Sequence, residues 1–137
     1  MQKKKSKAKE AASNLPQELA SYLLLIQELL EEKGYVRGVE LAERLHMSRP
    51  TVTRAIQRLA ALGFANYERY RGITLSASGV DAAAQASRRY RTVLDFLEST
   101  NAPMQNIQLE ARRLSASVSE DVLTAFRSAS QRLRKAG

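Results

Sequence analysis

The sequence predicts a mainly α-helical protein: a winged helix-turn-helix of three helices and a β-hairpin wing, followed by a helical C-terminal extension. Two short amphipathic segments, 39–45 and 48–59, are joined by a very short link, which is the pattern of a helix-turn-helix. Two β-type segments between residues 64 and 75 predict a hairpin directly after them. A long apolar-periodic segment then predicts a helix from about Ser76 to Ser99.

The segment 48–59 is the most informative part of the chain. Its apolar residues recur at helical spacing and predict one buried stripe: Val52, Ala55, Ile56 and Leu59. The opposite side carries hydrogen-bond donors and no carboxylate: Arg49, Thr51, Thr53, Arg54, Gln57 and Arg58. Such a helix can lie in a DNA major groove with its N-terminal residues facing base edges. The alternative, a helical hairpin with a solvated charged face, is weakened by the β-hairpin that follows.

A first helix is predicted before the helix-turn-helix. Pro16 and Glu18 are residues that favour the start of a helix, and Gly34 after Lys33 favours its end. The apolar residues between them predict its buried stripe: Leu19, Tyr22, Leu23, Ile26, Leu29 and Leu30.

The β-hairpin after the second of these segments is interpreted as a wing. Residues 64–69 alternate loosely as a strand, and residues 73–75 can return beside them after a turn at 70–72. Arg69 and Arg71 lie near the expected tip, where they can reach the phosphates of a DNA backbone.

The region 77–137 is predicted to be a helical dimerisation extension. Ser76 is expected to cap the long helix, and residues 101–103 interrupt it before two shorter helices near 103–113 and 119–134. The apolar positions are more than one short extension can cover alone: Val93, Leu94, Phe96, Leu97, Leu109, Leu114, Val118, Leu123 and Phe126. A homodimer interface is the simplest cover for them, and folding back on the N-terminal domain is the alternative.

The net charge of +8 is concentrated on two parts of the chain. The segment 1–14, expected to be a flexible arm, contains five Lys and one Glu. It is either a solvated tail or an arm that also touches DNA phosphates. In the winged helix-turn-helix domain, 15–76, the positive excess lies in the segment 37–71, which holds the second helix of the motif and the wing arginines. This distribution favours a polyanion such as double-stranded DNA, because neutralising phosphates releases condensed counterions.

The composition excludes several classes of protein. The absence of Cys excludes a disulfide framework, thiolate metal sites and a cysteine nucleophile. The longest apolar run, 22–26, is too short to cross a bilayer, and the N-terminus has no secretory signal pattern. We therefore expect a cytoplasmic protein without a membrane partner.

An enzymatic function is not expected. His46 is the single His and falls in a turn, and the Ser residues have no neighbouring His to activate them. No Gly-rich phosphate loop is present. The sequence therefore predicts no catalytic residues and no cofactor.

The function predicted from these features is sequence-specific regulation of transcription through DNA binding. The residues expected to contact DNA are Ser48, Arg49, Pro50, Thr51, Thr53, Arg54, Gln57, Arg58, Arg69 and Arg71. Those from Arg49 to Arg54 would approach bases, and Arg58 with the wing arginines would hold phosphates. A winged helix that docks another protein is the alternative, which the carboxylate-free helix face disfavours.

Several segments together carry a family resemblance: EEKGYVR (31–37), LAERL (41–45), SRPTVT (48–53), YERYRGITLS (67–76) and VSEDVL (118–123). Through them the chain resembles the metalloregulators of the diphtheria-toxin-repressor class, and especially the manganese transport regulators. The resemblance extends from about Leu15 to about Phe126. It implies a dimeric repressor that binds a palindromic operator.

The chain departs from this family at the metal site. The manganese members bind metal through an acidic pair on the first helix, a His on the long helix and a Glu-x-x-Glu-His group before the last helix. The aligned positions in this chain are Ser21, Leu24, Tyr90, Arg112, Ser115 and Ala116. No carboxylate or imidazole remains, so the resemblance implies a divergent member that lacks the metal ligands.

This departure leads to a hypothesis about regulation. Apolar packing of Leu24 and Tyr90 would replace the tie that the metal makes in the relatives, and the protein would bind DNA without metal. Two alternatives stay open. In the first, metal binds through residues outside the family site; in the second, the altered site holds an unknown effector, for which Arg112 and Arg113 would favour an anion.

Overall fold

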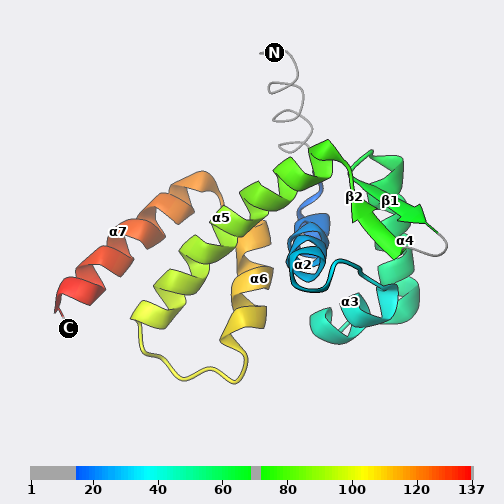
Figure 1. The fold of residues 1–137 in the computed structure, drawn as a ribbon. Coiled ribbons are helices and arrows are strands. Elements are labelled where there is room, and N and C mark those ends of the chain that lie inside the picture. Colours follow the sequence, from blue (N-terminus) through cyan, green and yellow to red (C-terminus); the bar gives the residue numbers. More distant parts are fainter. Residues whose placement is uncertain (1–14, 69–71, 137) are drawn as a thin grey trace, which may run out of the picture. The chain divides into compact units, whose positions relative to one another are not determined.

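The computed structural model describes residues 15–68 and 72–136 (Figure 1). Its elements are α2 (Gln17–Lys33), α3 (Gly38–Leu45), α4 (Arg49–Ala61), β1 (Ala65–Glu68), β2 (Gly72–Leu75), α5 (Ala77–Ser99), α6 (Ile107–Ser117) and α7 (Glu120–Ala136). The chain divides into two compact units, of which one ends at Gln85 and the other begins at Ala86, inside α5. The predicted mainly α fold with a winged helix-turn-helix and a helical extension is confirmed. No helix in the described ranges is long and apolar enough to span a membrane.

Helix α2 supplies the central apolar face of the N-terminal unit. It begins after Pro16, carries Glu18 in its first turn, and ends where Gly34 adopts a left-handed conformation with φ 82°. Its predicted stripe is buried apart from Leu30, which is partly buried against the core. Burial raises the pKa of the Tyr22 phenol above its ordinary value.

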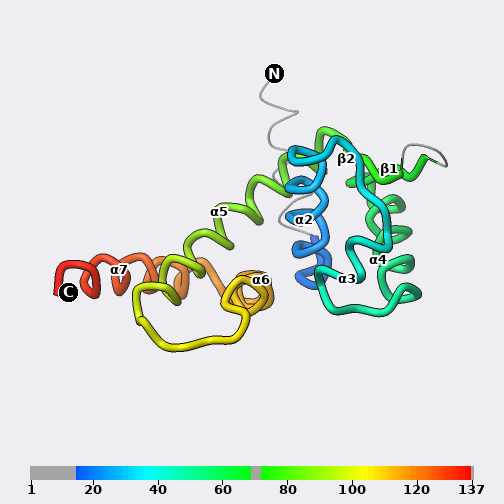
Figure 2. Tube along the Cα trace, turned by 60° about the horizontal axis from the view of Figure 1, so that its bottom comes forward, coloured from blue at the N-terminus to red at the C-terminus, as the bar shows by residue number. Residues whose placement is uncertain are grey.

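Helices α3 and α4 form the helix-turn-helix and contact both α2 and each other (Figure 2). His46 ends α3 in a left-handed conformation with φ 55°, the geometry for which Gly is usually chosen. Ser48 caps α4, because its Oγ accepts a hydrogen bond from the Thr51 amide at 3.3 Å. The four predicted apolar residues of α4 are all buried, which confirms the predicted stripe.

The wing consists of β1 and β2, which pair antiparallel with Ala65 opposite Leu75 and Glu68 opposite Gly72. The connector between α2 and α3, residues 34–37, is also joined to this hairpin by backbone hydrogen bonding. The Ile73 amide donates to the Val36 carbonyl at 3.0 Å, and Val36 forms a parallel bridge with Gly72. This connection joins the first residues of β2 to the segment between α2 and α3, and the sequence pattern did not predict it.

The C-terminal unit contains most of α5 together with α6 and α7. Ser76 caps α5, since its Oγ accepts from the Gly79 amide at 3.1 Å, as predicted. The predicted start of the next helix at residue 103 is wrong. Asn106 caps α6 by accepting from the Leu109 amide at 3.1 Å, so residues 103–106 remain a loop.

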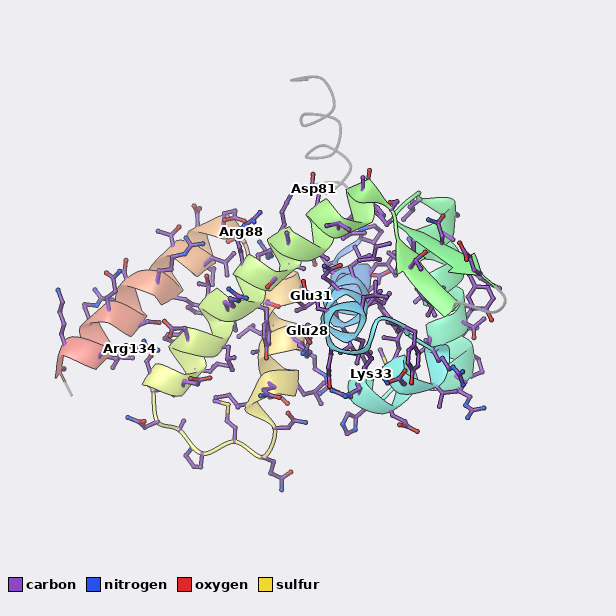
Figure 3. The ribbon with its side chains drawn as sticks, in the orientation of Figure 1. Glu28, Glu31, Lys33, Asp81, Arg88 and Arg134 are labelled. Atoms are coloured by element: carbon purple, nitrogen blue, oxygen red, sulfur yellow. The ribbon has the colours of Figure 1, made fainter. Side chains whose placement is uncertain are left out.

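Two contacts join α7 to α5 within this unit. The rings of Phe96 and Phe126 stack with centroids 4.3 Å apart. Arg134, which Figure 3 labels on α7, forms an ion pair with Asp95 of α5. The last helix starts where it was predicted to start, because the Ser119 Oγ accepts from the Val122 amide at 3.3 Å.

Candidate nucleic-acid interface

A groove in the N-terminal unit contains one face of α4. Arg49, Thr53 and Gln57 recur every four residues and therefore lie along one side of the helix, where they line this groove. Its volume is about 1070 Å³. The other walls come from the connector, with Tyr35 and Arg37, and from the wing, with Tyr67, Gly72 and Thr74. Helix α4, the connector, the start of α3 and the wing thus line one groove, in which hydrogen-bond donors lie beside apolar side chains such as Val39 and Ile56.

The remaining residues predicted on α4 have different positions. Arg54 and Pro50 are exposed and do not line the groove. The Ser48 and Thr51 hydroxyl oxygens lie 2.7 Å apart at the helix start, where Ser48 also caps the helix. The structure thus divides the predicted contact residues between a groove face, an exposed flank and the N-terminal cap.

Arg58 is held on the side of α4 that faces α2. Its Nη1 donates to the Glu18 Oε1 at 2.8 Å, and both side chains are more than half exposed. Surface ion pairs of this kind stabilise a protein by only about 0.2–1 kcal/mol, so a phosphate could compete with Glu18 for the guanidinium.

The two wing arginines predicted to contact phosphates, Arg69 and Arg71, lie outside the described residues, as does the basic segment 1–14. Tyr67, one residue before the end of β1, is 67% exposed. Its ring therefore lines the groove and is also accessible to solvent. In the sequence it lies two and four residues before the two arginines.

The sequence reasoning missed the connector. Tyr35 is 48% exposed, and two cationic groups lie near its ring, Lys33 Nζ at 4.9 Å and Arg37 Cζ at 5.8 Å from the centroid. Lys33, labelled in Figure 3, also forms an ion pair with Glu40 in the first turn of α3. The available signal was an aromatic residue flanked by basic ones directly after a helix-ending Gly, outside the helix-turn-helix itself.

The fold and this donor-rich groove define a winged-helix DNA-binding regulator. Residues 14–73 match the family model described as "Iron dependent repressor, N-terminal DNA binding domain". The chain is 35% identical over 106 residues to the transcriptional regulator MntR of Escherichia coli O157:H7, covering 77% of this chain and 68% of the relative. The chain belongs to the MntR family of transcriptional regulators.

Further comparisons agree with this family. The chain is 30% identical over 105 residues to the HTH-type transcriptional regulator MntR of Shouchella clausii, covering 77% of this chain and 73% of the relative. The crystal structure of T. acidophilum IdeR matches with a TM-score of 0.65 at 26% identity, over 80% of this chain and 52% of that one. The manganese regulator SloR, at 24% identity and a TM-score of 0.68, supports the fold alone. The chain spans about half the length of these solved structures, and the named relatives are regulators rather than enzymes.

The matching family model and the regulator SloR are named for iron and manganese, so the question is whether the side chains of this chain at the positions of the family's metal ligands could hold such an ion. The described parts of the chain contain no group of three or more His, Cys, Asp or Glu residues that could hold a metal ion. The Arg112 guanidinium carbon lies 4.8 Å from the centroid of the Tyr90 ring, so two of the aligned positions meet each other. Ser115 is 5% exposed and its hydroxyl donates to the Arg112 carbonyl at 3.0 Å. This set of side chains does not fit a divalent metal, because it offers no carboxylate or imidazole, neutral hydroxyl groups are weak ligands, and a guanidinium repels a dication.

Proposed function

We propose that this protein is a sequence-specific transcriptional repressor that binds double-stranded DNA as a homodimer and does not require manganese or iron. The observation that carries the proposal is the exposed face of α4, which presents donors and no carboxylate beside a groove shared with the connector and the wing. A helix of this kind, entering the major groove, reads base edges through its first turns.

Contacts to bases and to phosphates would come from different residues. Arg54 and Arg49 occupy the first half of α4, and an arginine there can pair bidentately with guanine. Thr53 and Gln57 add donors and acceptors on the groove side. Arg58, Arg37 and the wing arginines Arg69 and Arg71 would hold phosphates, which position the protein without reading sequence.

The homodimer is proposed for the C-terminal unit. Many of its apolar side chains are only partly buried: Leu94, Phe96, Leu97, Leu109, Leu114, Val118 and Phe126. Helix α7 in addition exposes Val122 by 37% and Leu133 by 42%. Exposed apolar surface on α5, α6 and α7 favours association with a second copy, because association removes that surface from water.

Metal independence and a cytoplasmic location complete the proposal. The aligned ligand positions offer hydroxyl, aromatic, aliphatic and guanidinium groups in place of carboxylates and imidazoles. A cytoplasmic regulator reaches DNA directly, and the absence of Cys is compatible with a reducing compartment.

Selection of bound DNA from a random pool, run in parallel with chelator and with manganese, tests the proposal. We expect the same palindrome in both arms, with half-sites about one helical turn apart. Enrichment only with manganese would contradict metal independence and would point to a metal site outside the aligned positions. If no sequence is enriched in either arm, the DNA-binding proposal fails, and docking of another protein becomes the better explanation of the fold.

A further inference from the structure

The contact between Tyr90 and Arg112 joins α5 to α6 inside the C-terminal unit. The guanidinium carbon lies 4.8 Å from the ring centroid, within the range of a cation–π interaction. Tyr90 is 9% exposed, and the Arg112 Nη1 atom is screened from solvent. A cation–π contact is stronger when water is excluded from it, so burial strengthens the attraction between Tyr90 and Arg112.

A guanidinium has two properties that matter at this position. It stays protonated throughout the accessible pH range, so its charge cannot be removed by titration. It is also covalently attached to α6, so its local concentration does not depend on the composition of the solution. The position therefore contains a permanent cation that needs no supply and does not dissociate.

A second guanidinium acts from the neighbouring residue of α5. Arg89 donates through Nε to the Ser115 carbonyl at 3.0 Å, through Nη1 to Glu120 Oε1 at 3.0 Å, and through Nη2 to the Val118 carbonyl. These acceptors lie at the end of α6, in the link that follows it and in the first turn of α7. Arg89 and Tyr90, two consecutive residues of α5, thus both contact the neighbouring helices. Arg89 bonds the end of α6 and the start of α7 through its own guanidinium, and Tyr90 contacts α6 through the guanidinium of Arg112.

We propose that Arg112 is a built-in cation that takes the place of an exchangeable metal ion. Stacked on Tyr90, it holds α6 against α5, so that the C-terminal unit is permanently arranged for DNA binding. The inference rests on the proposed function for its link to DNA, but the contact itself is a property of the C-terminal unit and can be measured without DNA. In this role Arg112 is a positioning residue, which acts through α6 and not by touching DNA.

Chemical rescue of Arg112→Ala tests this role. The substitution removes the cation and leaves space beside the Tyr90 ring. We expect the affinity for the selected DNA, measured in chelator, to fall about tenfold, as for loss of a desolvated cation–π contact. Guanidinium chloride at low millimolar concentration should restore part of the affinity. Urea, which has a similar shape and no charge, potassium chloride at equal ionic strength and manganese chloride should not.

Matched variants separate this role from a general loss of structure. Arg113→Ala removes the next arginine, whose side chain is 59% exposed and pairs with Glu110 at 3.8 Å, and should change little. Tyr90→Phe keeps the ring and should bind DNA within a few-fold of the parent chain, whereas Tyr90→Leu should resemble Arg112→Ala. Equal behaviour of the Arg112 and Arg113 variants, or rescue by urea as well as by guanidinium, would overturn the proposal.

The same series is measured by thermal unfolding, followed by circular dichroism. Guanidinium normally lowers stability, so an increase in Tm confined to Arg112→Ala would be specific to the vacated position. An absence of that increase would contradict the built-in cation even if the parent chain binds no DNA. Failure of the parent chain to bind DNA, with the specific increase present, would instead contradict only the proposed function.

Discussion

Single side chains determine which contacts α4 can make. Arg49, Thr53 and Gln57 line the groove, Arg54 lies on the exposed flank, and Arg58 is engaged by Glu18. The sequence predicted all five as DNA contacts from their shared polarity. It could not divide them into these groups, because the division depends on where α2, the connector and the wing lie around the helix.

Replacing Arg54 with Ala should relax sequence preference. Loss of a bidentate contact to guanine costs about 1–3 kcal/mol at the base concerned, while other positions of the operator keep their preference. Affinities for a panel of singly substituted operators measure this change. Arg71→Ala should instead weaken binding to every sequence alike, and identical profiles for the two variants would contradict the assignment of base and phosphate contacts.

Replacing Glu18 with Gln should strengthen DNA binding. The change removes the carboxylate that pairs with Arg58 at 2.8 Å and frees the guanidinium for a phosphate. We expect affinity for all sequences to rise a few-fold at low salt, and the slope of log K against log salt concentration to steepen by up to about 1. Glu31→Gln, in the last turn of α2, is the control with the same change of charge (Figure 3). Equal gains from both variants would show that net charge alone is responsible.

At the scale of elements, the wing and the start of α5 are positioned by close backbone contacts. A Cβ atom on Gly79 would lie 1.9 Å from the Phe64 carbonyl oxygen, and one on Gly72 would lie 2.3 Å from the Val36 carbonyl oxygen. Gly72 also has a φ of 80°. These two glycines allow the wing to approach the connector on one side and α5 on the other. The shape of the groove beside α4 depends on that approach.

Gly79→Ala should therefore destabilise the protein. The added methyl group cannot fit beside the Phe64 carbonyl unless α5 shifts, and overpacking of this kind costs about 1–3 kcal/mol. Chemical denaturation gives the change in the free energy of unfolding. Gly38→Ala is the matched control, because its Cβ would meet nothing closer than 3.9 Å and Ala favours a helix. Loss of stability in both variants would argue against the steric explanation.

At the scale of the whole molecule, the proposed assembly depends on apolar surface that the C-terminal unit leaves partly exposed. Leu133 and Val122 are 42% and 37% exposed on α7. A helix with two such residues on its surface can gain stability by burying them against a second copy.

Leu133→Glu should weaken the dimer without unfolding the monomer. A carboxylate in an apolar interface loses hydration that the interface does not replace, whereas an exposed Glu in a monomer costs little. Sedimentation velocity at several protein concentrations measures the change, and DNA affinity should fall in parallel. Gln131→Glu, at an exposed polar position of the same helix, should leave the assembly intact. An unchanged sedimentation profile for Leu133→Glu would place any dimer interface elsewhere.

The sequence by itself determined the elements whose signals are local. The stripe of α4, the caps at Ser76 and Ser119 and the stop at Gly34 act over a few residues, where periodicity and capping chemistry are readable. The predicted helix near 103–113 is placed about one turn too early, because α6 begins only after Asn106, whose side chain caps it.

The tertiary structure alone decided the contacts between distant segments. It brought Val36 to the wing, placed Tyr35 and Arg37 beside α4, and stacked Arg112 on Tyr90. The family resemblance implied that the metal ligands are absent, but not that two of the positions concerned contact each other. Such contacts depend on how whole helices pack, and packing depends on shape and burial summed over many residues. No periodicity within one segment contains that information.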